Sequence, residues 1–243
     1  MGAAYVLWNQ LLDKPRQPAL PTPYLGPEYD ASRIQEDLDR YKASYTVLND
    51  EALYERVAEL VDSGKVVGWF QGRMEWGPRA LGHRTILGDA RHPEMRSIIN
   101  MKIKMREGFR PFAPTILEDH IQEFFQIDRP SPYMLLVAPV QPDIHLPAIT
   151  HVDGSARIQS INRQQDERYY DMLNTFYRRT GCPVIINTSM NVRGEPIVNT
   201  PEDAYRCFMR THMDAIAIGN SLLLKEDQPE LELLSAREEF GLD

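Results

Sequence analysis

The sequence has few cysteines, no long apolar run and no leader-like N-terminus. Two cysteines among 243 residues, Cys182 and Cys207, are too few for a disulfide-stabilised scaffold, which favours a reducing compartment. No stretch approaches the roughly 20 apolar residues that a membrane-spanning helix needs, and no basic stretch followed by an apolar one opens the chain. These absences argue against a secreted or membrane protein, and we expect a cytoplasmic one.

Several common ligand-binding motifs are also missing. Neither G-x-x-x-x-G-K-[ST] nor G-x-G-x-x-G occurs, so the two commonest phosphate-binding loops are absent. The six histidines do not have the H-x-x-x-H spacing of zinc sites, and the cysteines do not form C-x-x-C, so we expect no protein-bound metal. A lone histidine is usually an ordinary polar residue. His83, between Gly82 and Arg84, is the one that we select for testing.

The charge is unevenly distributed along the chain. The formal net charge is -8, which argues against general nucleic-acid binding. Between Lys65 and Arg110, however, ten basic residues face four acidic ones, which makes this window +6 and leaves the rest of the chain at -14. A basic island in an acidic protein predicts a local anion site, although any single member can simply lie on a solvated helix face.

Helix and strand patterns alternate along the chain, which predicts an α/β or α+β fold with a mixed sheet. Apolar residues run through the N-terminal stretch 3–12, which we expect to be helical and to pack on a preceding domain. Ser32 and Thr200 are the expected N-caps of two helices, and Gly64 and Gly181 are the expected ends of two others. Helices are predicted over 32–41, 49–63, 93–106, 166–180 and 200–211, and extended segments over 66–70, 84–88, 109–117, 133–140, 148–151, 157–161, 183–186, 215–218 and 222–224.

Three segments are dense in groups that bind oxyanions. The first, QGRMEWGPRALGHR, carries three arginines on a backbone rich in glycine and proline, and the planar arginine fork binds phosphate through two parallel hydrogen bonds. The second joins a basic helix end to a stiff extended segment and contains Lys104, Arg106 and Arg110. The third combines Arg157 with the small polar residues that follow a buried strand, Asn187 to Asn191. The alternative for each is structural: paired arginines, cations at a helix C-terminus, and asparagines that form turns.

Taken together, these segments resemble the C-terminal half of the NodU-type O-carbamoyltransferases. This family includes enzymes that carbamoylate nodulation factors, cephalosporins and aminoglycosides. No single stretch is specific, but their combined order is, and they extend over nearly all of 66–225. The matching stretches are QGRMEWGPRALGHR, MREGFRPFAPTIL, PAITHVDGSARIQSI, PVIINTSMNVRGEPIVNTPEDA and DAIAIGNSLLLK.

The resemblance implies a YrdC-like domain, which is a twisted mixed sheet flanked by helices with a concave basic face. It also implies formation of carbamoyl-adenylate from carbamoyl phosphate and ATP, with Mg²⁺ on the pyrophosphate, and transfer to a hydroxyl by a separate N-terminal domain or subunit of actin-like fold. We therefore expect residues 1–30 to be a linker from such a domain, 31–225 the YrdC-like domain, and 226–243 an acidic tail.

The resemblance further implies the roles of individual residues. Arg157, Arg110 and Asn187 are the expected catalytic residues. His83, where the family commonly has Asn, and Met190, where it commonly has Phe, depart from the usual pattern and bear on the acceptor or nucleotide fit. The residues expected to bind carbamoyl phosphate and ATP are Arg73, Arg79, Arg84, Lys104, Arg106, Arg110, Arg157, Asn187, Thr188, Ser189 and Asn191.

Two other functions remain open from the sequence. The basic window also suits a YrdC-like module that binds double-stranded RNA, although the net charge and the lack of interleaved aromatics weigh against it. A non-catalytic module that supports an N-terminal transferase subunit is the second alternative. The acceptor and the oligomeric state are not predicted.

Overall fold

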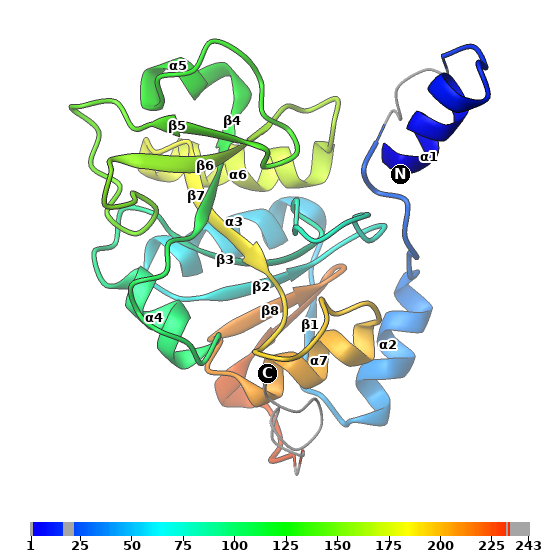
Figure 1. Ribbon diagram of the computed structural model, residues 1–243. Helices are drawn as coiled ribbons and strands as arrows, with labels where there is room; N and C mark the ends of the chain where they lie inside the picture. Colours follow the sequence, from blue (N-terminus) through cyan, green and yellow to red (C-terminus); the bar gives the residue numbers. More distant parts are fainter. Residues whose placement is uncertain (1, 17–21, 232, 234–243) are drawn as a thin grey trace.

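A computed structural model describes residues 2–16, 22–231 and 233, and its centre is one mixed sheet. The nine strands follow the order β1-β9-β8-β2-β3-β7-β4-β6-β5 (Figure 1). Two neighbouring pairs, β2 with β8 and β4 with β6, are parallel, and the other pairs are antiparallel. The strands are β1 (Thr46–Val47), β2 (Val67–Phe70), β3 (Arg84–Asp89), β4 (Ala113–Leu117), β5 (Leu136–Pro139), β6 (Ser155–Ile161), β7 (Val184–Ser189), β8 (Ala215–Ile218) and β9 (Ser221–Leu224).

Helices cover both faces of this sheet and enclose its apolar residues. Consecutive residues of a strand point to opposite faces, and in β2 Trp69 packs near Tyr54 of α3, whereas Phe70 packs near Tyr29 beside α2. α3 (Asp50–Asp62) and α6 (Glu167–Thr180) pack together on the first face. α2 (Ala31–Arg40) and α7 (Pro201–Arg210) pack together on the second face, where α7 contacts β8 and β2. The mixed α/β class predicted from the sequence is confirmed.

Local signals position the longer helices. Asn49, Asp166 and Thr200 cap α3, α6 and α7 with their side chains, and Thr200 forms a reciprocal capping box with Asp203. Gly181 ends α6 in the left-handed conformation, with φ of 72°. The predictions for Thr200, Gly64 and Gly181 are confirmed.

Two local predictions are wrong, and two predicted elements are shorter than expected. The cap of α2 is Asp30 rather than Ser32. Segment 148–151 is not a strand, because Ile149 and Thr150 donate their N–H groups back to Leu146 and close a turn. The helix predicted over 93–106 is α4 (Met95–Lys102), so Lys104 and Arg106 lie beyond its end, where Met105 has a positive φ of 49°. The strand predicted over 133–140 is β5, which is limited to Leu136–Pro139. Unpredicted elements are β1, the 3-10 turns Glu118–His120 and Lys225–Asp227, and α5 (Ile121–Phe124).

The difference between Asp30 and Ser32 predicts a difference in stability. Asp30 accepts the N–H of Arg33 at 2.8 Å, so Asp30→Ala leaves this N–H without an acceptor at the start of α2. We expect the free energy of unfolding to fall by about 1 kcal/mol. Ser32→Ala is the matched control, with an expected change within about 0.5 kcal/mol. Urea unfolding of both variants measures the difference, and an equal loss for the two would contradict the assignment of the cap.

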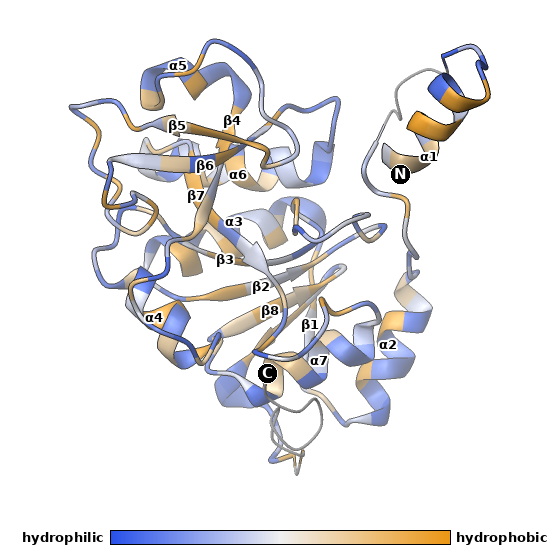
Figure 2. Ribbon diagram, viewed as in Figure 1, coloured by the Kyte–Doolittle hydropathy of each residue, from blue (hydrophilic) through white to orange (hydrophobic). Residues whose placement is uncertain are grey.

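The N-terminal segment has two parts with different surroundings. α1 (Gly2–Val6) and the π-turn Leu7–Leu11 stand clear of the sheet, and their apolar side chains are exposed, with Leu11 at 76% (Figures 1 and 2). Residues 22–30, in contrast, lie against the main body. No described helix is long and apolar enough to cross a membrane. Residues 17–21 and most of the predicted acidic tail, 232 and 234–243, lie outside the described residues.

Candidate active site

Two adjoining cavities, of about 360 and 150 Å³, lie where the end of β7 meets the segment after α4, Arg157 of β6 and residues 78–80. They share Arg106, Thr188 and Ser189. The larger is also lined by Lys104, Glu107, Arg110, Asn191, Val192, Arg193 and Gly194, and the smaller by Pro78, Arg79, Ala80, Pro111, Phe112, Ala113, Met134, Arg157 and Asn187. Cationic segments that are far apart in the sequence therefore meet at one place.

The arginines of these cavities lie close enough to repel one another. Burial, and secondly the charge of Arg79, lower the pKa of Arg157. Burial, and secondly the charge of Arg110, lower the pKa of Arg106. The Nε of Arg157 is buried and has no hydrogen-bond partner among the described residues. An anion placed between these groups would relieve the repulsion between their charges.

Lys104 is almost fully buried and forms the inner wall of the larger cavity. Its Nζ donates to Asn191 Oδ1 at 2.7 Å and to the Asn191 carbonyl at 3.0 Å, and it also contacts the carbonyl and hydroxyl of Ser189. Burial lowers the pKa of Lys104 to about 7. Ser189 and Asn191 lie two residues apart, so this one ammonium holds both side chains in the lining of the larger cavity.

A buried polar row crosses the sheet beneath the smaller cavity. Asn187 of β7 accepts from the Thr85 hydroxyl of β3 at 3.0 Å and donates to Gln159 Oε1 of β6 at 2.7 Å. Thr115 of β4 donates to the same Gln159 oxygen at 2.8 Å. Thr85, Thr115 and Gln159 were not predicted as site residues. Their alternation with apolar neighbours in buried strands was the available signal, since a buried polar side chain needs a partner.

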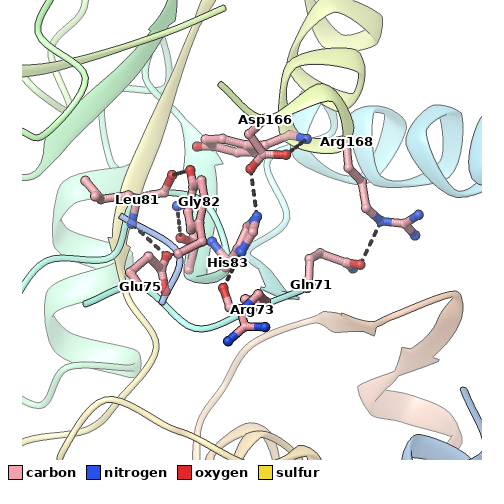
Figure 3. Close-up of polar contacts among 12 residues, drawn as sticks. Gln71, Arg73, Glu75, Leu81, Gly82, His83, Asp166 and Arg168 are labelled. Carbon is pink, nitrogen blue, oxygen red and sulfur yellow. Dashed lines mark hydrogen bonds and ion pairs between the residues drawn. The ribbon is translucent and has the colours of Figure 1, made fainter. Parts of the chain in front are cut away.

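The segment 71–84, which we call the arginine loop, is closed by two buried side chains (Figure 3). Glu75 Oε1 accepts the N–H groups of Leu81 at 2.8 Å and His83 at 2.7 Å, and that of Arg84. The ring of His83 contacts the carbonyl of Arg73 through Nδ1 and the carboxylate of Asp166 through Nε2 at 2.8 Å. The loop therefore has a fixed internal structure, and Arg79 stands on its exposed side.

Not all predicted site residues reach the cavities. Arg84 is fully buried on the opposite face of the sheet, where it stacks over Phe70 at 3.7 Å and donates to the carbonyls of Gln71 and Gly72. Burial lowers its pKa to about 10. Arg84 therefore lines neither cavity, because Arg84 and Thr85 are neighbours in β3 and their side chains point to opposite faces of the sheet. Arg73 is exposed and lines neither cavity. Asn187 is 1% exposed and lies in the floor.

The donor set does not fit a resident metal ion. Among the described residues, no group of three or more His, Cys, Asp or Glu side chains is arranged to hold one. Glu107 is the one carboxylate among the described residues that line the two cavities, and it pairs with Arg110 at 3.0 Å. The cavities are therefore suited to anions rather than to cations.

The sequence comparisons find curated proteins that are similar to this chain over most or all of its length. The chain is 46% identical, over its whole length, to the uncharacterized protein sll1178 of Synechocystis, and covers 44% of that protein. It is 38% identical to the nodulation protein NolNO of Sinorhizobium fredii, with 93% of this chain and 34% of that protein covered. The chain thus spans less than half the length of these relatives.

Solved structures share the fold at low sequence identity. HypF in a phosphate- and nucleotide-bound form matches with a TM-score of 0.51 and 17% identity, over 70% of this chain and 25% of that one. Pyrococcus abyssi Sua5 complexed with L-threonine matches with a TM-score of 0.51 and 16% identity, over 72% of this chain and 48% of that one. These similarities show a YrdC-like fold. The family model described as carbamoyltransferase C-terminus matches residues 58–225, so the chain belongs to the carbamoyltransferase family and corresponds to its C-terminal part.

Proposed function

We propose that this chain binds carbamoyl phosphate and ATP in the two adjoining cavities and forms carbamoyl-adenylate, acting in the cytoplasm. The observation that carries the proposal is that Arg79, Arg106 and Arg157 converge on the two adjoining cavities. Among the described residues, the lining of these cavities includes a single carboxylate. Two polyanionic reactants repel each other strongly unless cations share the site with them. Such a cluster supplies that compensation and fits the family to which the chain belongs.

The proposed reaction also consumes one water molecule. Carbamoyl phosphate and water give carbamate and phosphate, and a carbamate oxygen then attacks the α-phosphorus of ATP while the bond to pyrophosphate breaks. Charge develops on the phosphoryl and leaving oxygens, where fixed guanidinium groups stabilise it. We assign this role to Arg106, Arg110 and Arg157, with the polar row at Asn187 as a rigid floor beneath the reacting groups.

The remaining predicted ligands orient the substrates. Thr188 and Ser189 offer hydroxyl groups at the boundary of the two cavities, and Asn191 offers an amide in the larger one. Lys104 holds Ser189 and Asn191 in place. Since the donor set does not fit a resident metal, Mg²⁺ enters bound to the triphosphate of ATP rather than to the protein.

We further propose that transfer of the carbamoyl group to a hydroxyl needs a separate N-terminal transferase domain or subunit of actin-like fold. The support is that the curated relatives extend well beyond the region that this chain matches. The exposed apolar side chains of α1 and of the π-turn after it are the surface that we assign to this contact. On this proposal, the acceptor is chosen outside the residues described here.

The test of the proposed function is carbamoyl-phosphate-dependent exchange of labelled pyrophosphate into ATP. We expect exchange by the wild-type chain and a loss of about 100-fold or more in Arg157→Gln, because the buried Nε and the charge of Arg157 are both removed from the cavity. Arg163→Gln is the matched control, since Arg163 is exposed and pairs with Glu167 and Asp171 away from the cavities. Undiminished exchange in Arg157→Gln would exclude this role.

A further inference from the structure

Both ring nitrogens of His83 face oxygen atoms that accept hydrogen bonds. Nδ1 contacts the carbonyl of Arg73, and Nε2 contacts Asp166 Oδ2 at 2.8 Å (Figure 3). A neutral imidazole carries one N–H, so one of these contacts would then set two lone pairs against each other. An imidazolium satisfies both at once. The geometry therefore fits the charged form of the ring.

The ring is enclosed by three parts of the chain. Asp166, through its other oxygen, accepts the N–H of Tyr169 and caps α6. Tyr24, from segment 22–30, stacks on the ring with 3.9 Å between centroids and an interplanar angle of 19°. Glu75, from the arginine loop, accepts the backbone N–H of His83. Asp166, Glu75 and Tyr24 are the titratable groups that face the ring, and the two carboxylates both favour its charged form.

These contacts help to hold the arginine loop in place. His83 holds the beginning of the loop at the carbonyl of Arg73, and Glu75 holds its end at Leu81 and His83. Between these two points stand Pro78 and Arg79, which line the smaller cavity. Backbone hydrogen bonds of Met74 and Trp76 with segment 22–30 also hold the loop. Loss of the contact at Arg73 therefore removes one of several ties, and we expect Arg79 to be held less tightly over the cavity.

We propose that His83 is a positioning residue of the candidate active site: as an imidazolium, it ties the arginine loop to the start of α6 and so keeps Arg79 in its anion-binding position. The inference rests on the proposed function, because it assumes that the cavity binds an oxyanion. Apparent affinity falls by the fraction of molecules whose loop is out of place. Anion binding should therefore weaken when His83 loses its proton.

The direction of the pH dependence follows from the environment of the ring. Burial lowers the pKa of His83, but the hydrogen bond to Asp166 and the charges of Asp166 and Glu75 outweigh burial, and the net pKa is raised above its usual 6.5. A group whose folded-state pKa is raised contributes its full stabilisation below the unfolded value and loses it as pH rises through the folded value. The tie is thus complete below pH 6.5 and is lost as the pH rises through the raised pKa of His83 in the folded protein.

The test is calorimetric titration of the wild type and of His83→Asn with sulfate, whose charge is constant between about pH 6 and pH 9. Lys104 also loses its charge in this range, so affinity falls with pH in both proteins, and the comparison isolates His83. We expect the fall in affinity to be roughly tenfold larger in the wild type. His145→Asn, at an exposed position outside both cavities, should behave as the wild type.

A second measurement does not depend on a variant that folds. If the protonated ring favours anion binding, saturating sulfate must raise the pKa of His83 measured by NMR in the wild type. An equal fall in affinity in the wild type and His83→Asn, or a pKa unchanged by sulfate, would overturn this inference and leave the proposed function intact. Failure of the wild type to bind sulfate, carbamoyl phosphate or ATP at any pH would overturn both.

Discussion

Arg106→Gln should lower carbamoyl-phosphate-dependent pyrophosphate exchange by roughly 100- to 1,000-fold, the effect of removing one fixed donor from a developing anion. Arg106 is the arginine that lines both cavities. Its Nε donates to Asn100 Oδ1 at 2.7 Å, and its guanidinium lies 5.1 Å from the ring of Phe112. These contacts fix the guanidinium of Arg106 in the shared lining of the two cavities.

One further variant separates the charge of Arg106 from its geometry, and a second serves as a control. Arg106→Lys keeps the charge but loses the planar fork, so we expect activity between those of the wild type and Arg106→Gln. Arg129→Gln is the matched control, because Arg129 is exposed, pairs with the neighbouring Asp128 and contributes little. Exchange at the wild-type level in Arg106→Gln would remove Arg106 from the mechanism.

Gly82→Ala should destabilise the fold by about 3 kcal/mol or more, which is the second large effect. Gly82 has a φ of +121°, a backbone conformation that residues other than glycine rarely adopt. A Cβ at this position would lie 2.3 Å from Cδ1 of the buried Tyr169 ring. Tyr169 cannot move aside easily, because its hydroxyl donates to Thr115 within the polar row.

Gly77→Ala is a matched control for Gly82→Ala. Gly77 has nearly the same φ, +122°, but nothing lies within 4 Å of a Cβ built there. The control therefore has the backbone strain without the clash, and we expect about 1 to 2 kcal/mol. Denaturant unfolding of both variants gives the two free energies of unfolding, and equal losses would show that the clash with Tyr169 is relieved at no cost.

Local features of the fold could be predicted from the sequence to the extent that they depend on neighbouring residues. Thr200 with Asp203, and Gly181 after an amphipathic run, fix their helix ends within a few residues, and these predictions are confirmed. Asp30 and Ser32 are both good N-caps, so composition alone does not choose between them. Segment 148–151 begins with the buried apolar residues Ala148 and Ile149, as a strand would. The N–H groups of Ile149 and Thr150 nevertheless bond back to Leu146, which a short apolar run does not reveal.

The candidate site could be predicted only in part, because its geometry depends on strand order. The sequence supplies the arginine-rich segments, and the family resemblance orders them. The sheet order β3-β7-β4-β6 then places Thr85, Asn187, Thr115 and Gln159 side by side, although they are up to 102 residues apart. The position of Arg84 away from the cavities depends on the same geometry, since a shift of one residue along β3 decides which face of the sheet a side chain joins.

The role of Lys104 illustrates a further limit of prediction from the sequence. The sequence places it in a basic window, where an exposed cation is the ordinary expectation. Its burial and its contacts with Ser189 and Asn191 depend on the chain turning at Met105 and meeting β7 some 85 residues later. Tertiary contacts of this kind carry no local signal.

The central claim is that cationic segments distant in the chain surround one pair of anionic reactants. A crystal structure of the chain soaked with carbamoyl phosphate and a non-hydrolysable ATP analogue tests it most directly. The account predicts that the phosphates of both ligands lie in the adjoining cavities, in contact with Arg79, Arg106 and Arg157. Ligand density elsewhere, with these three guanidinium groups making no contact to it, would contradict the account.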